Sequence, residues 1–197
     1  MTRIILASQS AARSQLLAGA GVAFDKIVSG VDEDLVKVRI QAEGGSPRAV
    51  AQALADIKAV TVSDLQPGLV IGADQTLEFE GALYDKAASL EEARARLLAL
   101  RGQPHHLHSA VTLAKDGEVL WSETACATLT MRDFSEPFLD AYLDQEGEAL
   151  LGSVGCYRLE GLGAQLFAQI EGDYFAILGL PLLGLLHQLR QRGALVP

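Results

Sequence analysis

The sequence predicts an α/β fold in which a mixed, twisted sheet with flanking helices forms two lobes around a central cleft. Segments typical of helices and of strands alternate along the chain, and a long hairpin in its middle implies antiparallel pairing. The length of 197 residues suits one domain or two small lobes around a cleft. We therefore expect residues 1–197 to form a single domain.

The first part of the chain alternates strands and helices. Residues 3–7 are apolar and predict a buried strand, and residues 8–21 follow as a helix with a serine cap and a terminal glycine. Residues 23–35 predict a second strand that breaks into an acidic loop. Residues 46–65 predict a long helix, because a serine and a proline stand at the N-cap and the first helical position.

The segment LVIGADQTLEFEG, residues 69–81, raises a question. It predicts one strand that ends at Asp74 and a second strand that runs to Glu80. A carboxylate at the end of a buried strand indicates either a turn or a catalytic acid or metal ligand at the rim of the sheet. Both alternatives stay open on this pattern alone.

The remaining segments complete the α/β alternation. Residues 89–102 predict a helix with a capping box, and residues 105–131 predict a hairpin with KDG as its turn. Residues 135–147 predict a helix, residues 152–172 are glycine-rich and then strand-like, and residues 179–193 predict a closing helix.

Composition excludes several classes of protein. Hydrophobic residues make up 49% and charged residues 21%, which is typical of a globular domain. The formal net charge of −9 argues against nucleic-acid binding, although a small phosphorylated ligand needs only a few local cations. No apolar run approaches the ~20 residues that span a membrane, and the apolar start is short for a signal peptide, so we expect a cytoplasmic protein without membrane contact. Cys126 and Cys156 lack metal-binding spacing and predict small buried thiols.

The first strand-to-helix loop is a candidate anion site. Ser8 and Ser10 lie in this loop and Arg13 lies in the first helical turn. Free N–H groups at a helix N-terminus attract anions, and an arginine can add a bidentate phosphate contact. Capping serines with a solvated arginine are the alternative interpretation, and the favoured one from this pattern alone.

Acidic and basic residues elsewhere suit phosphate chemistry. Asp32, Glu33 and Asp34 form either a solvated turn or a site for a hard cation such as Mg²⁺. Lys58 lies in the long helix and Lys86 in a loop before a helix. Each lysine is either an ordinary surface residue or a partner for phosphate.

The histidines are a separate candidate. His105, His106 and His108 suggest a metal site, but a stable zinc site needs further ligands, so ordinary polar contacts are favoured. The anion loop, the lysines and the acids together match what hydrolysis of a phosphoanhydride needs: charge neutralisation, a metal and an oriented water. Asp74 would then be the base for that water or a metal ligand.

Six motifs, in order along nearly the whole chain, resemble those of the Maf-type nucleoside triphosphate pyrophosphatases. The matching segments are IILASQSAARSQLL, VDED, LADIKA, VIGADQTLEFEGALYDKA, LRGQPHHLHSAV and GSVGCYRLEGLGAQLFAQIEGDYFAILGLPL. The resemblance implies the Maf/ITPase-like fold and a hydrolase that releases a nucleoside monophosphate and pyrophosphate with a divalent cation, Mg²⁺ or Mn²⁺. It also suggests a homodimer.

The resemblance implies a role for each matching residue. Asp74 would be the proton acceptor, Glu33 would serve the metal or the water, and both would be the metal ligands. Lys58 and Lys86 would neutralise phosphate charge. The implied substrate-binding residues are Ser8, Arg13, Gln75, His105 and Glu160.

Departures from the family pattern bear on specificity and on activity. Ala12 and Ala87 replace an arginine and a proline, and Ser153 stands where the pyrimidine-preferring branch has a lysine. Gln75 and the segment EGLGAQLF are more similar to the branch that acts on 7-methyl-GTP, whose base Glu160 could recognise. An alternative is a catalytically weakened nucleotide-binding regulator of cell division and septum formation. A generic ligand-binding domain is the third hypothesis.

Overall fold

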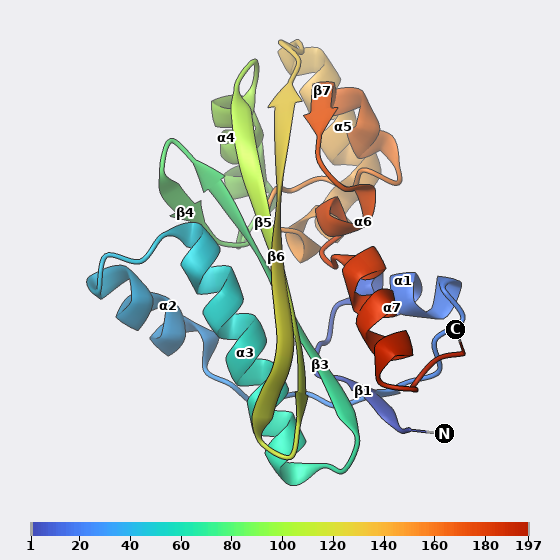
Figure 1. The fold of residues 1–197 in the computed structure, drawn as a ribbon. Coiled ribbons are helices and arrows are strands. Elements are labelled where there is room, and N and C mark those ends of the chain that lie inside the picture. The colour runs from blue at the N-terminus through green and yellow to red at the C-terminus, as the bar shows by residue number, and fades with distance from the viewer. Residues whose placement is uncertain (1, 197) are drawn as a thin grey trace.

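The computed structural model describes residues 2–196 and contains a seven-stranded mixed sheet (Figure 1). The strand order is β2-β1-β3-β5-β6-β7, and β4 pairs with β3 off this path. Strands β2, β1 and β3 are parallel, whereas the other pairings are antiparallel. The strands are β1 (Ile4–Leu6), β2 (Asp25–Lys26), β3 (Leu69–Phe79), β4 (Ala82–Tyr84), β5 (Pro104–Lys115), β6 (Glu118–Met131) and β7 (Phe167–Glu171). The predicted α/β class with a mixed sheet is confirmed.

Helices flank this sheet on both sides of its long central strands (Figure 1). Helix α3 packs on β3 and β5, and α2 packs on α3. The α-helices are α1 (Ala11–Gly19), α2 (Glu33–Ala42), α3 (Pro47–Leu65), α4 (Leu90–Leu100), α5 (Glu136–Glu146), α6 (Tyr174–Ile177) and α7 (Leu182–Gln191). Two 3₁₀ helices are η1 (Gly147–Gly152) and η2 (Leu162–Leu166). Among residues 2–196, no helix combines the length and the apolar character needed to cross a membrane.

Local sequence signals account for many of these boundaries. The side chains of Ser10, Ser46, Ser89 and Ser135 cap α1, α3, α4 and α5 by accepting a backbone N–H. The β5–β6 hairpin turns at Asp116 and Gly117, which both have positive φ (53° and 80°), as a two-residue hairpin turn requires.

Two predictions for the first half of the chain were wrong. Residues 32–34 are not a loop: Asp32 caps α2, which begins at Glu33, and the positive end of a helix favours acids there. Strand β3 does not end at Asp74 either. It continues without a break to Phe79, and Asp74 pairs with Ala110 of β5 in the middle of the ladder.

Two separate hydrophobic clusters divide the molecule into the predicted two lobes. One contains Leu69 and Ile71 from the start of β3, packed with residues of β1, α1 and α7. The other contains Leu77 and Phe79 from the end of β3, packed with residues of α4, α5 and β6. Strand β3 therefore passes through both clusters, and Asp74 lies between them.

Glycine at position 72 allows α3 to lie directly against β3. A Cβ atom at Gly72 would be 2.2 Å from the carbonyl oxygen of Ala55 and 2.6 Å from the backbone nitrogen of Ala59. Such distances are far below van der Waals contact, so only glycine permits this approach. Lys58 lies on the same stretch of α3 and is thereby brought close to Asp74.

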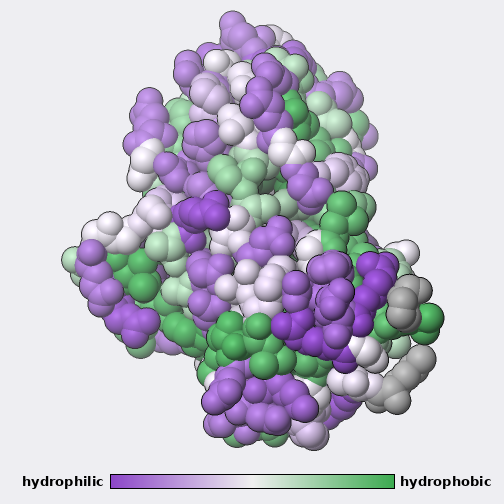
Figure 2. Space-filling view, in the orientation of Figure 1, coloured by the Kyte–Doolittle hydropathy of each residue, from purple (hydrophilic) through white to green (hydrophobic). Residues whose placement is uncertain are grey.

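Surface features bear on two further predictions. Cys156 is buried as predicted, but Cys126, which lies in β6, is exposed. Apolar side chains are exposed on α2 (Leu35 and Val38) and on β6, and green surface is visible over both elements in Figure 2. The homodimer stays a prediction.

Candidate active site

A cleft of about 1030 Å³ lies between the two lobes. It is bordered by the N-terminal ends of α1 and α2, by the middle of β3, by the loop after β4 and by the segment 149–160. Most of the predicted site residues line this cleft, and they come from six separate parts of the sequence: Ser8, Arg13, Glu33, Lys58, Asp74, Gln75, Lys86 and Glu160.

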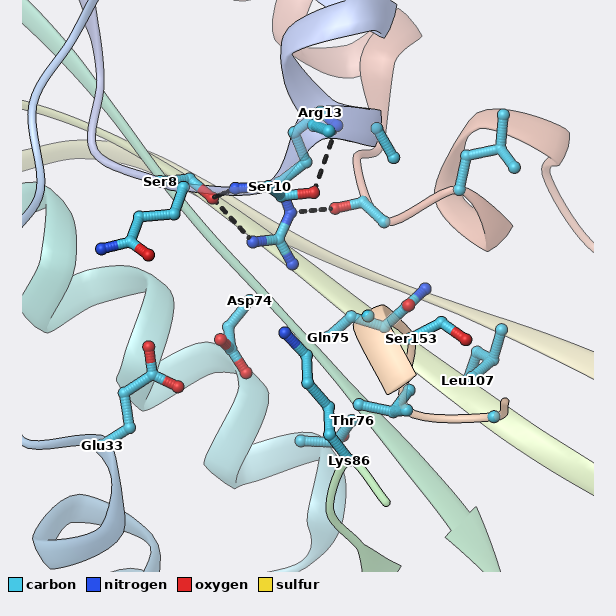
Figure 3. A pocket seen from close by; sticks show the side chains of 18 of the residues that line it. Ser8, Ser10, Arg13, Glu33, Asp74, Gln75, Thr76, Lys86, Leu107 and Ser153 are labelled. Carbon is cyan, nitrogen blue, oxygen red and sulfur yellow. Dashed lines mark hydrogen bonds between the residues drawn. The ribbon is translucent and has the colours of Figure 1, made fainter. Parts of the chain in front are cut away.

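Arg13 is a buried cation at the edge of the cleft (Figure 3). Its Nε donates to the carbonyl oxygen of Gly179 at 2.8 Å, and its Nη1 donates to the carbonyl oxygen of Ala73 at 3.0 Å and to Ser8 Oγ at 3.1 Å. Burial lowers the pKa of Arg13, which the charges of Asp74 and Glu33 oppose. A guanidinium still keeps its charge in a protein, so the alternative of a solvated arginine is wrong.

The first loop was expected either to cap α1 or to bind an anion, and Ser10 and Ser8 take one of these roles each. Ser10 caps α1 by accepting the N–H of Arg13. Ser8 Oγ accepts from the Ser10 N–H and from Arg13 Nη1. Because a hydroxyl carries one hydrogen of its own, Ser8 can still donate that hydrogen to an anion in the cleft.

Lys58 bridges the two predicted metal ligands. Its Nζ lies 2.7 Å from Asp74 Oδ1 and 2.6 Å from Glu33 Oε1. Burial raises the pKa of Asp74, whereas the charges of Lys58 and Arg13 lower it, and the net shift is upward. A carboxylate whose pKa is raised is a stronger base than an ordinary aspartate.

The donor set of Glu33 and Asp74 fits a hard divalent cation. Both carboxylates face the same part of the cleft (Figure 3). Mg²⁺ is bound in many enzymes by one or two carboxylates with the remaining ligands from water and substrate phosphates. Within residues 2–196 no group of three or more His, Cys, Asp or Glu side chains could hold a metal, so an all-protein metal cage is not formed there.

Lys86 and Gln75 also line the cleft, and in the view of Figure 3 they lie on the opposite side of Asp74 from Glu33. The side chain of Lys86 reaches from the loop after β4 into the cleft that Asp74 and Gln75 also line (Figure 3). Gln75 Nε2 donates to Ser109 Oγ at 2.8 Å and to the carbonyl oxygen of Ile177 at 3.0 Å. The amide nitrogen of Gln75 therefore holds the α6 segment, and its oxygen is the group left for a ligand.

Glu160 lies in the segment 153–160, which lines another wall of the cleft. Hydrogen bonds within this segment hold it in place. Ser153 Oγ donates to the carbonyl oxygen of Tyr157 at 2.9 Å and accepts the Tyr157 N–H at 3.1 Å. A Cβ at Gly155 would be 2.2 Å from the ring of Tyr157, so the segment packs closely on itself. Ser153 thus shapes the wall on which Glu160 lies.

The prediction that His105 binds substrate is wrong. His105 is fully buried and is not among the cleft residues. Its Nε2 shares a 2.7 Å hydrogen bond with the hydroxyl of Tyr157, and burial lowers its pKa to about 4, so the ring is neutral. His105 therefore contacts the segment that carries Glu160 from the side of the hydrophobic core, through Tyr157. His106 contacts Thr128 and His108 contacts Glu78, as expected for ordinary polar contacts.

An ion pair that the sequence analysis did not predict also lines the cleft. Lys37 Nζ lies 2.6 Å from Asp85 Oδ1 and 3.2 Å from Asp34 Oδ1, which links α2 to the loop of Lys86. Desolvation acts to lower the pKa of Lys37, but hydrogen bonds to Asp85 and Asp34 outweigh it and raise that pKa. The i,i+3 spacing of Asp34 and Lys37 would have been a signal once residues 33–42 were known to be helical.

Known proteins resemble this chain over nearly its whole length. A nucleoside triphosphate pyrophosphatase of Caulobacter vibrioides is 59% identical over 195 residues, covering 99% of this chain and 98% of the relative. A protein of the same name from Paramagnetospirillum magneticum is 55% identical and is matched over 100% of its length, with 98% of this chain covered. A 7-methyl-GTP pyrophosphatase of Brucella abortus is 45% identical, with 96% of each chain covered.

These relatives carry both a general and a specific name, so the 7-methyl-GTP branch is not favoured by similarity and stays a prediction. The family model described as "Maf-like protein" matches residues 3–192. The motifs that suggested this resemblance and the mixed sheet agree with that match. This chain belongs to the Maf-like protein family.

Proposed function

We propose that this protein is a nucleoside triphosphate pyrophosphatase that uses Asp74 as the proton acceptor. The observation that carries the proposal is the meeting of three cations, Arg13, Lys58 and Lys86, with the carboxylates of Glu33 and Asp74 in one cleft. Cations neutralise a triphosphate, and a carboxylate beside them can activate water. The names of the relatives support the same activity.

The phosphates are bound at the end of the cleft formed by α1 and the loop of Lys86. Arg13 Nε and Nη1 are fixed by protein oxygens, so the guanidinium is held in place and its Nη2 is the nitrogen left for a phosphate oxygen. Ser8 donates its hydroxyl hydrogen, and Lys86 brings an ammonium from the opposite side. Ala12 leaves Arg13 as the arginine at this end of α1.

Asp74 removes a proton from the attacking water. The water oxygen forms a bond to the α-phosphorus while the bond to the bridging oxygen breaks, and pyrophosphate leaves with that oxygen. The proton passes to Asp74, whose raised pKa makes it a competent acceptor. Glu33 and Asp74 would hold Mg²⁺ or Mn²⁺, which supplies charge neutralisation on the phosphates.

The base of the nucleotide lies against the wall formed by residues 153–160. Glu160 is exposed on this wall, where its carboxylate can accept hydrogen bonds from a guanine edge and favours a positively charged base such as 7-methylguanine. The free oxygen of Gln75 adds a second acceptor. These acceptors support 7-methyl-GTP as the preferred substrate.

A nucleotide panel tests this proposal. The purified protein is incubated with 7-methyl-GTP, GTP, UTP and dTTP in Mg²⁺ or Mn²⁺, and the products are separated. We expect pyrophosphate as the first product, fastest with 7-methyl-GTP. In H₂¹⁸O the label should appear in the nucleoside monophosphate, since water attacks the α-phosphorus. Orthophosphate as the first product, or label in pyrophosphate, would contradict the proposed attack.

The alternative of a weakened regulator of cell division makes a different forecast. It requires nucleotide binding without turnover. The replacements Ala12 and Ala87 favour it, whereas the intact set of Arg13, Lys58 and Asp74 favours catalysis. A thermal shift with nucleotide in the absence of any product would support the regulator.

A further inference from the structure

Arg96 is a buried arginine of α4 that lies outside the cleft. It is 7% exposed and is not one of the cleft residues. The two hydrogens of its Nη1 are donated to two backbone carbonyl oxygens, that of Asp85 and that of Val154 at 2.7 Å. A charged donor shared between two backbone segments is a strong constraint on both of them.

The two carbonyls belong to two different segments that both line the cleft. Asp85 directly precedes Lys86, whose side chain lines the cleft. Val154 lies at the start of the segment that carries Glu160. One nitrogen atom therefore joins the phosphate side of the cleft to its base side, although these two segments are far apart in the sequence.

The guanidinium is itself held in one place. Arg96 Nη2 donates to Glu92 Oε1 at 3.0 Å, and the guanidinium carbon lies 5.4 Å from the centre of the Tyr84 ring. Glu92 Oε2 also accepts the N–H of Ala88 at 2.9 Å, which ties the loop of Lys86 to α4 a second time. Such a fork of fixed donors is available to arginine and not to lysine.

We propose that Arg96 is a positioning residue that couples the placement of Lys86 to that of the base-recognising segment 153–160. The inference rests on the proposed function, because it gives Lys86 and Glu160 their roles in that reaction. Loss of the Nη1 donors frees both segments, so turnover and discrimination between bases change together. Replacing a residue that only supports the fold would lower stability without changing turnover and base discrimination together.

Four variants separate these possibilities. Arg96→Met removes the donors and keeps an unbranched side chain, and Arg96→Lys restores a charge with one nitrogen. Arg94→Met is the matched control on the same helix, because Arg94 pairs with Glu136 and Asp140 away from the cleft. Leu129→Ala, in the fully buried core near α4, is the control for a general loss of stability.

Kinetics with 7-methyl-GTP and UTP give the first readout, at a temperature well below every melting point. We expect Arg96→Met to lower kcat about 100-fold, as for a misplacement of reacting groups by about 1 Å. The ratio of the kcat/KM values for 7-methyl-GTP and UTP should fall about tenfold. Arg96→Lys should recover part of the wild-type kcat and part of the wild-type ratio of kcat/KM values. Arg94→Met and Leu129→Ala should keep the wild-type ratio.

Hydrogen exchange of the nucleotide-free protein gives a second readout that does not need activity. Amides of residues 85–88 and 153–160 should both exchange faster in Arg96→Met, and not in Arg94→Met. Faster exchange in only one segment, or an unchanged selectivity ratio in Arg96→Met, would overturn the coupling. If the wild-type protein releases no pyrophosphate, the proposed function fails, while exchange still decides whether Arg96 joins the two segments.

Discussion

Replacing Lys58 with methionine should shift the pH dependence of the reaction upward. Lys58 Nζ lies 2.7 Å from Asp74 Oδ1, and both side chains are largely buried. At an effective dielectric constant of about 20, two unit charges at this distance attract by about 6 kcal/mol. Arg13 and solvent screen part of this attraction, and shifts of about 1–3 pKa units are typical for a neighbouring opposite charge. We therefore expect the pKa of Asp74 to rise in Lys58→Met, because the attraction that favours its charged form is lost.

The direction of the shift in the pH profile follows from the proposed role of Asp74 as a base. A base acts only when it is deprotonated, so activity falls as the pH drops through the pKa of Asp74. Burial already raises that pKa above its ordinary value of 3.8. Without Lys58, the nearby charge of Glu33 raises it further, and the acid limb of kcat/KM moves to higher pH by the same amount.

Two measurements check this shift. The first is the pH profile of kcat/KM for residual activity, with Lys37→Met as the control, because Lys37 contacts Asp34 and Asp85 instead of Asp74. The second is the ¹³C carboxyl resonance of Asp74 in metal-free protein, assigned by its loss in Asp74→Asn. An unchanged Asp74 titration in Lys58→Met would refute the electrostatic reasoning, whatever the residual activity.

Three further perturbations test the site and its support. Asp74→Asn should lower pyrophosphate release about 10²–10⁴-fold while the nucleotide-induced thermal shift is kept, and a loss of less than tenfold would show that another group takes the proton. Gly72→Ala should cost about 1–3 kcal/mol in urea unfolding and lower activity, because its Cβ would be 2.2 Å from the Ala55 carbonyl oxygen, whereas Gly19→Ala meets nothing within 4 Å and should be neutral. Removing divalent metal with EDTA should abolish turnover and adding Mg²⁺ or Mn²⁺ should restore it; full activity in EDTA would contradict the role of Glu33 as a metal ligand.

Local signals in the sequence predicted the elements whose boundaries depend on nearby residues. The serine caps and the two-residue turn at Asp116 and Gly117 follow from hydrogen bonds and backbone angles within a few positions, and the structure agrees. The start of α2 was missed because three consecutive acids are as typical of a loop as of a helix N-terminus. Only the packing of Val36 on α3 decides between them.

Site residues whose role depends on distant partners were harder to predict. His105 shares its face of β5 with Leu107, which lines the cleft, because the two residues are two positions apart in the strand. Strand alternation alone therefore does not tell whether the histidine faces the ligand or the core. Its partner Tyr157 lies in a segment from the other end of the chain, so the sequence holds no local sign of the buried hydrogen bond. The contact of Lys37 with Asp85 and the double contact of Arg96 were invisible for the same reason.

The continuation of β3 past Asp74 explains why a carboxylate lies within a buried strand. If the strand turned at Asp74, the carboxylate would lie at a solvated rim, and its pKa would stay near the ordinary value. Because β3 continues into the second hydrophobic cluster, both neighbouring lobes desolvate Asp74 and raise its pKa. Gly72 in the same strand lets α3 approach, which brings in Lys58, whose charge lowers the pKa of Asp74 against this burial. A single uninterrupted strand thus sets both the strength of the base and the position of its cation.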